Sequence, residues 1–438
     1  MIAPRLRSRL AAALALLAAL LVAVASRRID RERGTTSEPD VRPPALDDDA
    51  AGRIAALGSP QPLLADAVEE TSLMRPMPLE AFRCNPFPLL VSAALALVAM
   101  IIFAIAAPKA AAGGWLAAFV FWSGLPVGST VALMIHRLTG GRWGWRIAPV
   151  MLPSAATVPL MAALFLPVVL APKLFLPWAA AAPSLSSLQR DVAQIYFNFP
   201  FFILRSLAAF ILWSVIAFVL PRLSGRRGVL LAAVGLILHV ILVSLLGGDW
   251  IFSLQPAFIS TSFGATLTFF ELASVLAWAL VLSPGAGNDD GTKDVGGLLL
   301  ATLLGITYIN FIAVLVIWYG NLPDKVFWFV DRDAWPWRAL AIFAFLAGSI
   351  GPIFALFPGR VRRDPRALQA IAVIALIGFA AYFAYLVVPP FGLLALASTP
   401  IAIIAMGSLI LACSGSLWGR RNFHRWRSAS AEGTDRAA

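Results

Sequence analysis

Long apolar stretches, each close to twenty residues, recur along the chain between residues 88 and 413. A transmembrane helix needs about 20 predominantly apolar residues to cross a bilayer. The stretches are continuous and do not alternate with period two, which argues against a transmembrane β-barrel. The pattern therefore predicts an all-α, polytopic bundle of ten membrane helices, at about 89–107, 115–136, 149–171, 200–220, 228–247, 254–283, 296–320, 337–357, 367–387 and 391–413.

The chain on either side of this core has a different character. Residues 1–26 form a hydrophobic segment that fits either a signal peptide or a short additional membrane helix. Residues 27–87 are rich in Pro, Asp, Glu and Arg, which predicts a polar, largely disordered arm. Residues 88–413 form the predicted membrane domain, and residues 414–438 form a basic tail.

Composition and loop charges set the orientation of the predicted bundle. The chain is 60% hydrophobic and 13% charged, well below the roughly 25% charged residues of soluble domains. With residue 87 inside, the inner loops and tail carry sixteen Lys and Arg residues and the outer loops carry six. This asymmetry favours ten spans with both ends of the core inside, and an N-terminal segment that is either an uncleaved anchor or a weak interfacial segment. The net charge of +11 thus reflects basic loops that set the topology, and it does not indicate that the chain binds nucleic acid.

Few residues in this chain are suited to hold a redox cofactor. Cys84 and Cys413 are the cysteines, and no CxxCH or ferredoxin-type motif occurs. The histidines are His136, His239 and His424, fewer than a two-haem cytochrome b needs. His136 and His239 are predicted at different depths, so they would not share one haem. We therefore expect no metal and no cofactor on this chain, and any electrons must be carried by a partner.

The stretch from His239 to Glu271 is the first candidate site. Two apolar helices are predicted to flank a break at Gly247-Gly248-Asp249-Trp250. Ionisable side chains inside a membrane are costly and are functional by default, so His239, Asp249 and Glu271 are candidates for catalytic proton transfer. The alternative is a hairpin with an interfacial Asp and two residues hydrogen-bonded between helices. A rise of about 1.5 Å per residue places His239 near the midplane, Asp249 roughly 15 Å further out, and Glu271 in the inner half.

A polar stripe is predicted on the helix 254–283. Thr261, Gly264, Thr268 and Glu271 fall at spacings of three and four residues and share one face, which Ser274 continues. Such a stripe would carry protons through hydroxyls and water. Small and hydroxyl residues also pack membrane helices together, so both interpretations stand.

Polar residues in two further regions are candidates for binding. Arg205 lies near the predicted outer end of its helix, where it would either snorkel to the surface or pair with Asp249. Thr307, Tyr308 and Asn310 lie near the middle of the helix 296–320. The outer loop after Asn321-Leu322-Pro323 interleaves charges with tryptophans, which fits either an interfacial aromatic belt or a docking surface.

Four segments in the same order resemble a known family. They are LTGGRWGW (138–145), FNFPFFILRS (197–206), GGDWIFSLQP (247–256) and IWYGNLPDKVFWFVDR (317–332). These segments resemble the second quinone-binding subunit of quinol:cytochrome c oxidoreductase, or alternative complex III, in the polysulfide-reductase-like group of membrane anchors. The resemblance covers about 88–413 and does not extend to residues 1–87.

The resemblance implies a multi-pass subunit in a bacterial inner membrane, without cofactors of its own. Expected partners are a larger homologous anchor, an iron–sulfur subunit and c-type cytochromes, which would hold the clusters and haem c. Quinol is the expected substrate of the complex. The resemblance leaves open whether this subunit binds quinol or only supports the complex and conducts protons. Predicted quinone-binding residues are Arg205, Trp250, Tyr308 and Asn310, and predicted docking residues are Asn321, Pro323, Asp324, Asp331 and Arg332.

Two other functions compete with a quinol-oxidising subunit. A proton-coupled secondary transporter would use the same three ionisable residues, but transporters of that kind usually show inverted repeats and helices broken at the midplane. No internal repeat is found here, and the predicted Gly-Gly break lies near the surface. The remaining alternative is a purely structural membrane anchor.

Overall fold

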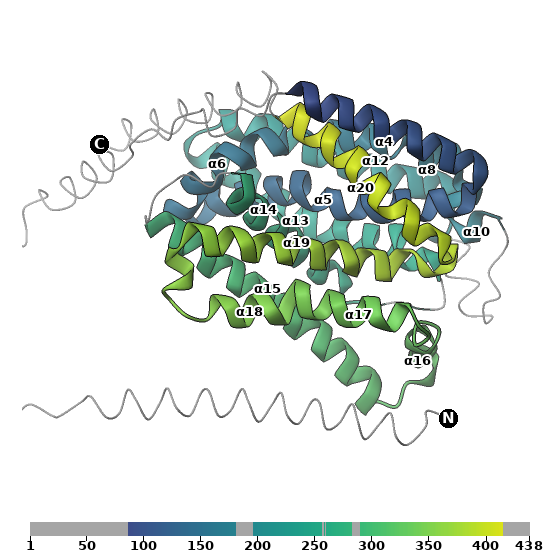
Figure 1. Cartoon of the computed structure of the whole chain (residues 1–438). Coiled ribbons are helices and arrows are strands. Elements are labelled where there is room, and N and C mark those ends of the chain that lie inside the picture. The colour runs from purple at the N-terminus through teal and green to yellow at the C-terminus, as the bar shows by residue number, and fades with distance from the viewer. Residues whose placement is uncertain (1–85, 181–195, 256–257, 259, 283–289, 415–438) are drawn as a thin grey trace, which may run out of the picture. The chain divides into compact units, whose positions relative to one another are not determined.

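The computed structural model describes residues 86–180, 196–255, 258, 260–282 and 290–414, with the side chains of 180, 290 and 324 left out. Every regular element in these ranges is a helix (Figure 1). The hydrophobic segment 1–26, the arm from residue 27 to residue 85 and the tail from residue 415 lie outside the described residues, so the predictions made for them stay predictions.

The predicted polytopic helical bundle is confirmed. Within the described ranges, nine helical spans are long and apolar enough to cross a membrane, and a tenth is obtained if one bent pair is counted as a single span. The spans are built from α4 (Pro86–Ala106), α5 (Pro108–Thr139), α12 with η2 (Phe199–Val219, Leu220–Arg222), α13 with η3 (Gly225–Trp250, Phe252–Leu254), α14 (Phe263–Leu282), α15 (Asp290–Tyr319), α17 with η4 and α18 (Trp337–Phe345, Leu346–Ile350, Gly351–Leu356), α19 (Pro365–Val387) and α20 (Leu394–Ser414).

The bent pair corresponds to the span predicted as one helix at 149–171. It runs from α6 (Arg142–Ala155) into α7 (Val158–Leu164) and α8 (Leu166–Leu170), with an angle of 40° at the break. Pro149 and Pro153 lie inside α6, and Pro159 and Pro167 open the two helices that follow. Each proline removes a backbone N–H and clashes with the preceding turn, so a straight span is disfavoured. Short helices α9 (Pro172–Phe175) and α10 (Pro177–Ala180) follow.

Helix α5 forms the centre of the bundle. Its most apolar window is 94% buried, and it contacts α4, α6, α13, α14, α19 and α20. Small residues on α5 allow this close packing, as is usual in membrane proteins. A Cβ on Gly128 would lie 2.0 Å from the carbonyl oxygen of Glu271, and one on Gly124 would lie 2.7 Å from the hydroxyl of Ser274. These two glycines therefore bring α14, and Glu271 with it, directly against α5.

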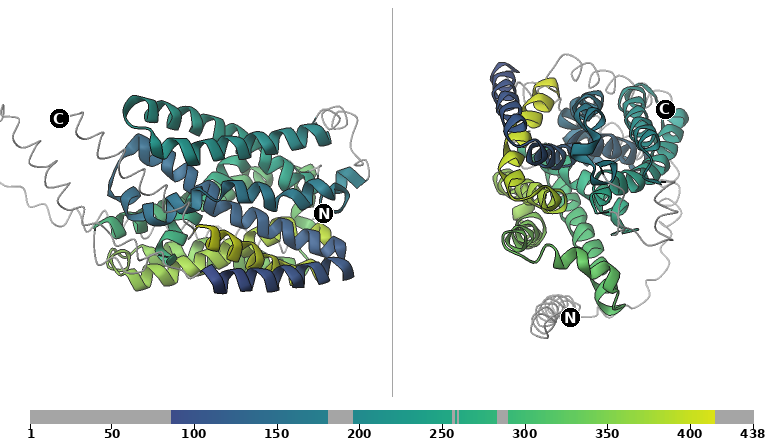
Figure 2. Two further views of the ribbon diagram at one scale, coloured as in Figure 1. Left: turned by 90° about the horizontal axis from the view of Figure 1, so that it is seen from above. Right: turned by 90° about the vertical axis from the view of Figure 1, so that its right-hand side faces the viewer.

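Helix α15 is much less buried than α5. Only 17% of its apolar window is buried, and it slants away from the other helices toward α16 (Pro323–Val330), as Figures 1 and 2 both show. It packs on α14, α6 and α18 but makes little contact with α17 or α19. The remaining short elements are η5 (Val361–Arg363) and η6 (Pro389–Phe391).

Candidate functional site

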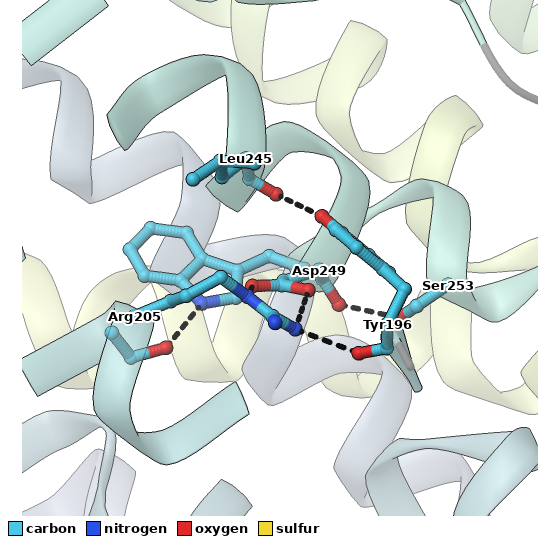
Figure 3. A network of polar contacts seen from close by, with 7 residues as sticks. Tyr196, Arg205, Leu245, Asp249 and Ser253 are labelled. Atoms are coloured by element: carbon cyan, nitrogen blue, oxygen red, sulfur yellow. Dashed lines mark hydrogen bonds and ion pairs between the residues drawn. The ribbon is translucent and has the colours of Figure 1, made fainter. Parts of the chain in front are cut away.

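An ion pair joins α12 to the end of α13. The Arg205 guanidinium donates from Nε and Nη2 to the two carboxylate oxygens of Asp249, at 2.6 and 2.7 Å (Figure 3). Nη2 also donates to the carbonyl oxygen of Tyr196 at 3.1 Å, and the guanidinium carbon lies 4.3 Å from the centre of the Tyr196 ring. Asp249 is 1% exposed. We call Tyr196, Arg205 and Asp249 the Arg205 cluster.

This pair explains why the predicted break at Gly247–Trp250 is wrong. Helix α13 continues to Trp250, so Asp249 lies in its last turn rather than in a loop. The Tyr196 hydroxyl donates to the carbonyl of Leu245 at 2.9 Å, and a Cβ on Gly248 would lie 2.8 Å from that hydroxyl. Glycine at position 248 leaves room for the Tyr196 hydroxyl to approach the backbone of α13. Burial raises the pKa of Tyr196 and the Asp249 charge raises it further, so this hydroxyl stays a neutral donor.

Both carboxylate oxygens in the Arg205 cluster are hydrogen-bonded. Both carboxylate oxygens of Asp249 accept from Arg205, and its backbone carbonyl accepts from the Ser253 hydroxyl. Trp250 donates from its indole nitrogen to the Ser206 hydroxyl at 3.2 Å and stacks on Phe210. A bidentate, buried pair of this kind fixes two helices against each other. The snorkelling alternative for Arg205 is therefore wrong, and its pairing with Asp249 is confirmed.

A second polar cluster lies deeper in the bundle. The Trp213 indole on α12 donates to Nδ1 of His239 at 3.1 Å. On the other side of the imidazole, Nε2 lies 3.2 Å from Oε2 of Glu271 and 3.4 Å from the Thr268 hydroxyl, both on α14. His239 is fully buried and Glu271 is nearly so. We call these four residues the His239 cluster.

The bond from Trp213 fixes the tautomer of His239. An indole nitrogen can only donate, so Nδ1 must present its lone pair, and the ring proton of neutral His239 is on Nε2. That proton points toward Thr268 and Glu271. Thr268 already donates to the carbonyl of Gly264 at 3.1 Å, so its oxygen is free to accept from Nε2. His239 is thus oriented as a hydrogen-bond donor to α14.

Glu271 is incompletely satisfied in this arrangement. Its Oε2 is close to His239, but the contact does not have the angles of a hydrogen bond, and Oε2 is buried without a hydrogen-bond partner in the described residues, as is the hydroxyl of Ser274. Glu271 also lines a small cavity of about 20 Å³ among α5, α12, α13, α14 and α19. A cavity needs roughly 10–15 Å³ to hold a water molecule, so one water fits beside this carboxylate.

Two details of the predicted proton route are corrected. Helix α14 begins at Phe263, so Thr261 is exposed before it, and the stripe is confined to Gly264, Thr268, Glu271 and Ser274. Glu271 lies near the middle of α14 and level with His239, not in the inner half. Because Asp249 pairs with Arg205 and Glu271 with His239, the three predicted catalytic residues form two clusters instead of one.

The predicted quinone-binding residues are not brought together. Arg205 belongs to the ion pair, and Trp250 is buried beside it and lines the small cavity. On α15, Tyr308 is 65% exposed and points away from the bundle, whereas Asn310 lines a separate, larger cavity. Residues two apart on an α-helix are about 200° apart around its axis, so these two side chains cannot share a site.

Three of the predicted docking residues, Asn321, Pro323 and Asp331, are exposed, but Arg332 is buried. Asn321 adopts a left-handed conformation with φ of 46°, Pro323 opens α16, and Asp331 is exposed; the side chain of Asp324 lies outside the described residues. Arg332, by contrast, is 2% exposed. Its guanidinium donates to Gln255 at 2.6 Å and lies 3.8 Å from the centre of the Trp328 ring.

Arg332 therefore anchors the loop after α16 to the bundle, and its buried side chain is not accessible to a partner. Burial lowers the pKa of Arg332 to about 10, which leaves it charged at neutral pH. Sequence reasoning counted it with the loop charges because burial of a single loop residue leaves no periodic signal. Trp213 and Tyr196, which complete the two clusters, were not singled out either.

Residues suited to a metal do not cluster in this structure: within the described ranges, no group of three His, Cys, Asp or Glu side chains is close enough to hold an ion. A scan against protein-family models finds no match, and a search of curated proteins finds none either.

Proposed function

We propose that this chain is a membrane subunit of a quinol-oxidising electron-transfer complex of the quinol:cytochrome c oxidoreductase type, and that it conducts protons through the His239 cluster. The observation that carries the proposal is the buried contact of His239 with Glu271, whose carboxylate is incompletely hydrogen-bonded beside a water-sized cavity. Such a carboxylate can accept and release a proton with a small rearrangement, whereas Asp249 is held by two hydrogen bonds from Arg205.

The proposed partners follow from what the chain lacks and what it resembles. Quinol oxidation releases electrons and protons together, so the electrons must pass to haem or iron–sulfur centres in partner subunits. A larger homologous anchor, an iron–sulfur subunit and c-type cytochromes would supply these centres in a bacterial cytoplasmic membrane. In this proposal, the partner subunits carry the electrons, and the His239 cluster carries only protons.

Glu271→Gln tests the role of the carboxylate. Glutamine keeps the size and the hydrogen bonds but cannot exchange a proton, so we expect proton uptake and release by the reconstituted complex to slow by about a hundredfold. The matched control is Ser274→Ala, which removes another buried, unpartnered polar atom from the same helix. Equal proton rates in Glu271→Gln and the control would remove this cluster from any proton route.

Co-purification tests membership of the complex separately. The tagged chain should carry proteins with haem c and iron–sulfur spectra out of its own membranes in mild detergent. If it purifies without them, and proteoliposomes of the chain alone move protons with a solute, the transporter function is correct instead.

A further inference from the structure

The larger of the two cavities lies beside α14, where Phe270 lines it. Its volume is about 110 Å³, and it is enclosed by α14, α15, α17, η4 and α19. Its polar lining comprises Thr307, Asn310, Ser349, Tyr382 and Tyr385, and rings of Phe270, Phe345 and Phe379 complete the walls. None of the proposed functions above uses this cavity.

The cavity results from how three helices diverge. Helix α15 slants away from α17 and α19 (Figures 1 and 2), and Asn310 of α15 lines the cavity between them. On the other wall, η4 is a π-helical turn, a widened geometry that is frequent at functional sites. Gly378 of α19 touches Gly348 of η4, where a Cβ would lie 2.1 Å from the backbone nitrogen. This contact holds η4 and α19 together at one edge of the cavity.

Hydrogen-bonding groups in the cavity are available to a ligand. Tyr382 donates to the side-chain carbonyl of Asn310 at 3.1 Å, and the Asn310 amide donates to Ile306 at 2.9 Å, which leaves its second N–H for a ligand. Ser349 is 6% exposed, and it lines the cavity. A serine hydroxyl can both donate and accept, so Ser349 is suited to hydrogen-bond a molecule in the cavity.

The lining also limits the kind of occupant. No charged side chain lines the cavity, so a neutral molecule is favoured. Phe345 is 46% exposed at its mouth, and Leu304, Phe311 and Ile342 are exposed on the two flanking helices. The mouth therefore opens sideways onto the apolar surface that faces lipid, and an occupant would arrive from the membrane.

We propose that this cavity binds the ring of a membrane quinone or quinol. Ser349 and the second N–H of Asn310 would donate to the ring oxygens, Tyr382 would hold Asn310 in place through its hydrogen bond, and the isoprenoid tail would leave past Phe345. This inference rests on the proposed function and names the substrate site of this subunit. An enclosed cavity of about 150 Å³ binds benzene, so 110 Å³ with an open mouth is of the right size for one substituted ring. The proposal replaces Arg205, Trp250 and Tyr308 as quinone ligands.

Photolabelling tests the site on the full chain in nanodiscs. The probes are short-tailed azido-ubiquinone and azido-menaquinone analogues, and adducts are mapped by peptide mass spectrometry with and without excess unlabelled quinone. We expect competed adducts within 301–315 and 341–352. The double variant Ser349→Ala/Tyr382→Phe should bind the quinone roughly tenfold more weakly, since it removes hydrogen bonds typically worth that factor together.

The matched control is Tyr308→Phe/Ser408→Ala. It also removes one tyrosine and one serine hydroxyl. The tyrosine is on the exposed face of α15, and the serine is in a buried contact with Ser92 on α4. The control should bind quinone like the wild type. Adducts on α4 or α12, adducts that excess quinone does not compete, or equal weakening in both double variants would overturn the proposal and leave the cavity to water or a lipid chain.

These results are separable from the proposed proton role. If Glu271→Gln slows proton movement but the quinone analogues do not label this chain, the quinone site alone is refuted. If labelling succeeds but Glu271→Gln is silent, the proton role alone is refuted.

Discussion

The Arg205–Asp249 pair allows a quantitative prediction about stability. Asp249 is 1% exposed and the Arg205 side chain 14%, so removing either partner strands the other charge in a largely buried position. Breaking a buried ion pair typically costs about 3–5 kcal/mol. We expect Arg205→Leu to lower the free energy of unfolding by about that amount. Asp249→Leu should cost slightly less, because the guanidinium keeps the Tyr196 carbonyl and ring.

Replacing both residues should restore most of the loss. Apolar residues in place of a buried ion pair are often neutral or stabilising, because both desolvation costs disappear. In Arg205→Leu/Asp249→Leu the Tyr196 carbonyl also loses a donor at 3.1 Å, which costs about 1 kcal/mol. We therefore expect the double variant within about 2 kcal/mol of the wild type, and a coupling energy of at least about 2 kcal/mol.

The assay is unfolding of the purified chain by SDS in mixed micelles, followed by tryptophan fluorescence and far-UV circular dichroism. Single costs that add to within about 0.5 kcal/mol would refute the coupling. The same double variant also tests function in the assembled complex. If it folds like the wild type but quinol oxidation is lost, Asp249 has the catalytic role that its position in the membrane predicted; normal oxidation assigns it to structure.

Two further predictions concern packing. Gly378→Ala should cost about 1–3 kcal/mol in the SDS assay, because its Cβ would meet the backbone of Gly348, whereas Gly297→Ala, with open space around it, should be neutral or slightly stabilising. Arg332→Gln should speed hydrogen exchange in α16 by roughly tenfold or more through loss of its buried, charged hydrogen bond; Arg338→Gln, which breaks an exposed ion pair, should leave that exchange nearly unchanged.

The membrane spans were predictable because they depend on local composition. Apolar stretches of the right length mark each helix wherever they occur, and every predicted span from residue 89 onward has a helical counterpart. The kink in 149–171 was also accessible, since four prolines fall within it. The continuation of α13 through Gly247-Gly248 was not, because it depends on a partner for Asp249 that lies 44 residues earlier in the chain.

The candidate sites were only partly predictable for a related reason. His239, Asp249 and Glu271 stood out as charges in apolar segments, but their pairing depends on Arg205 and on the glycines of α5 that bring α14 close. Ser349 had no sequence signal, since a serine in a membrane helix is usually a packing residue. Helical periodicity alone, however, separates Tyr308 from Asn310, and it would have removed Tyr308 from the predicted site.

The two cavities are related through one side chain. Phe270 lines both of them, stacked on Tyr382 at 4.6 Å toward the larger cavity, while its neighbour Glu271 lines the smaller one. Because consecutive helical residues are about 100° apart, α14 presents the ring and the carboxylate to different sides of the same turn. A quinol ring in the larger cavity would therefore be separated from the buried carboxylate by the Phe270 ring. A proton would then pass between the two sites only when the Phe270 ring moves.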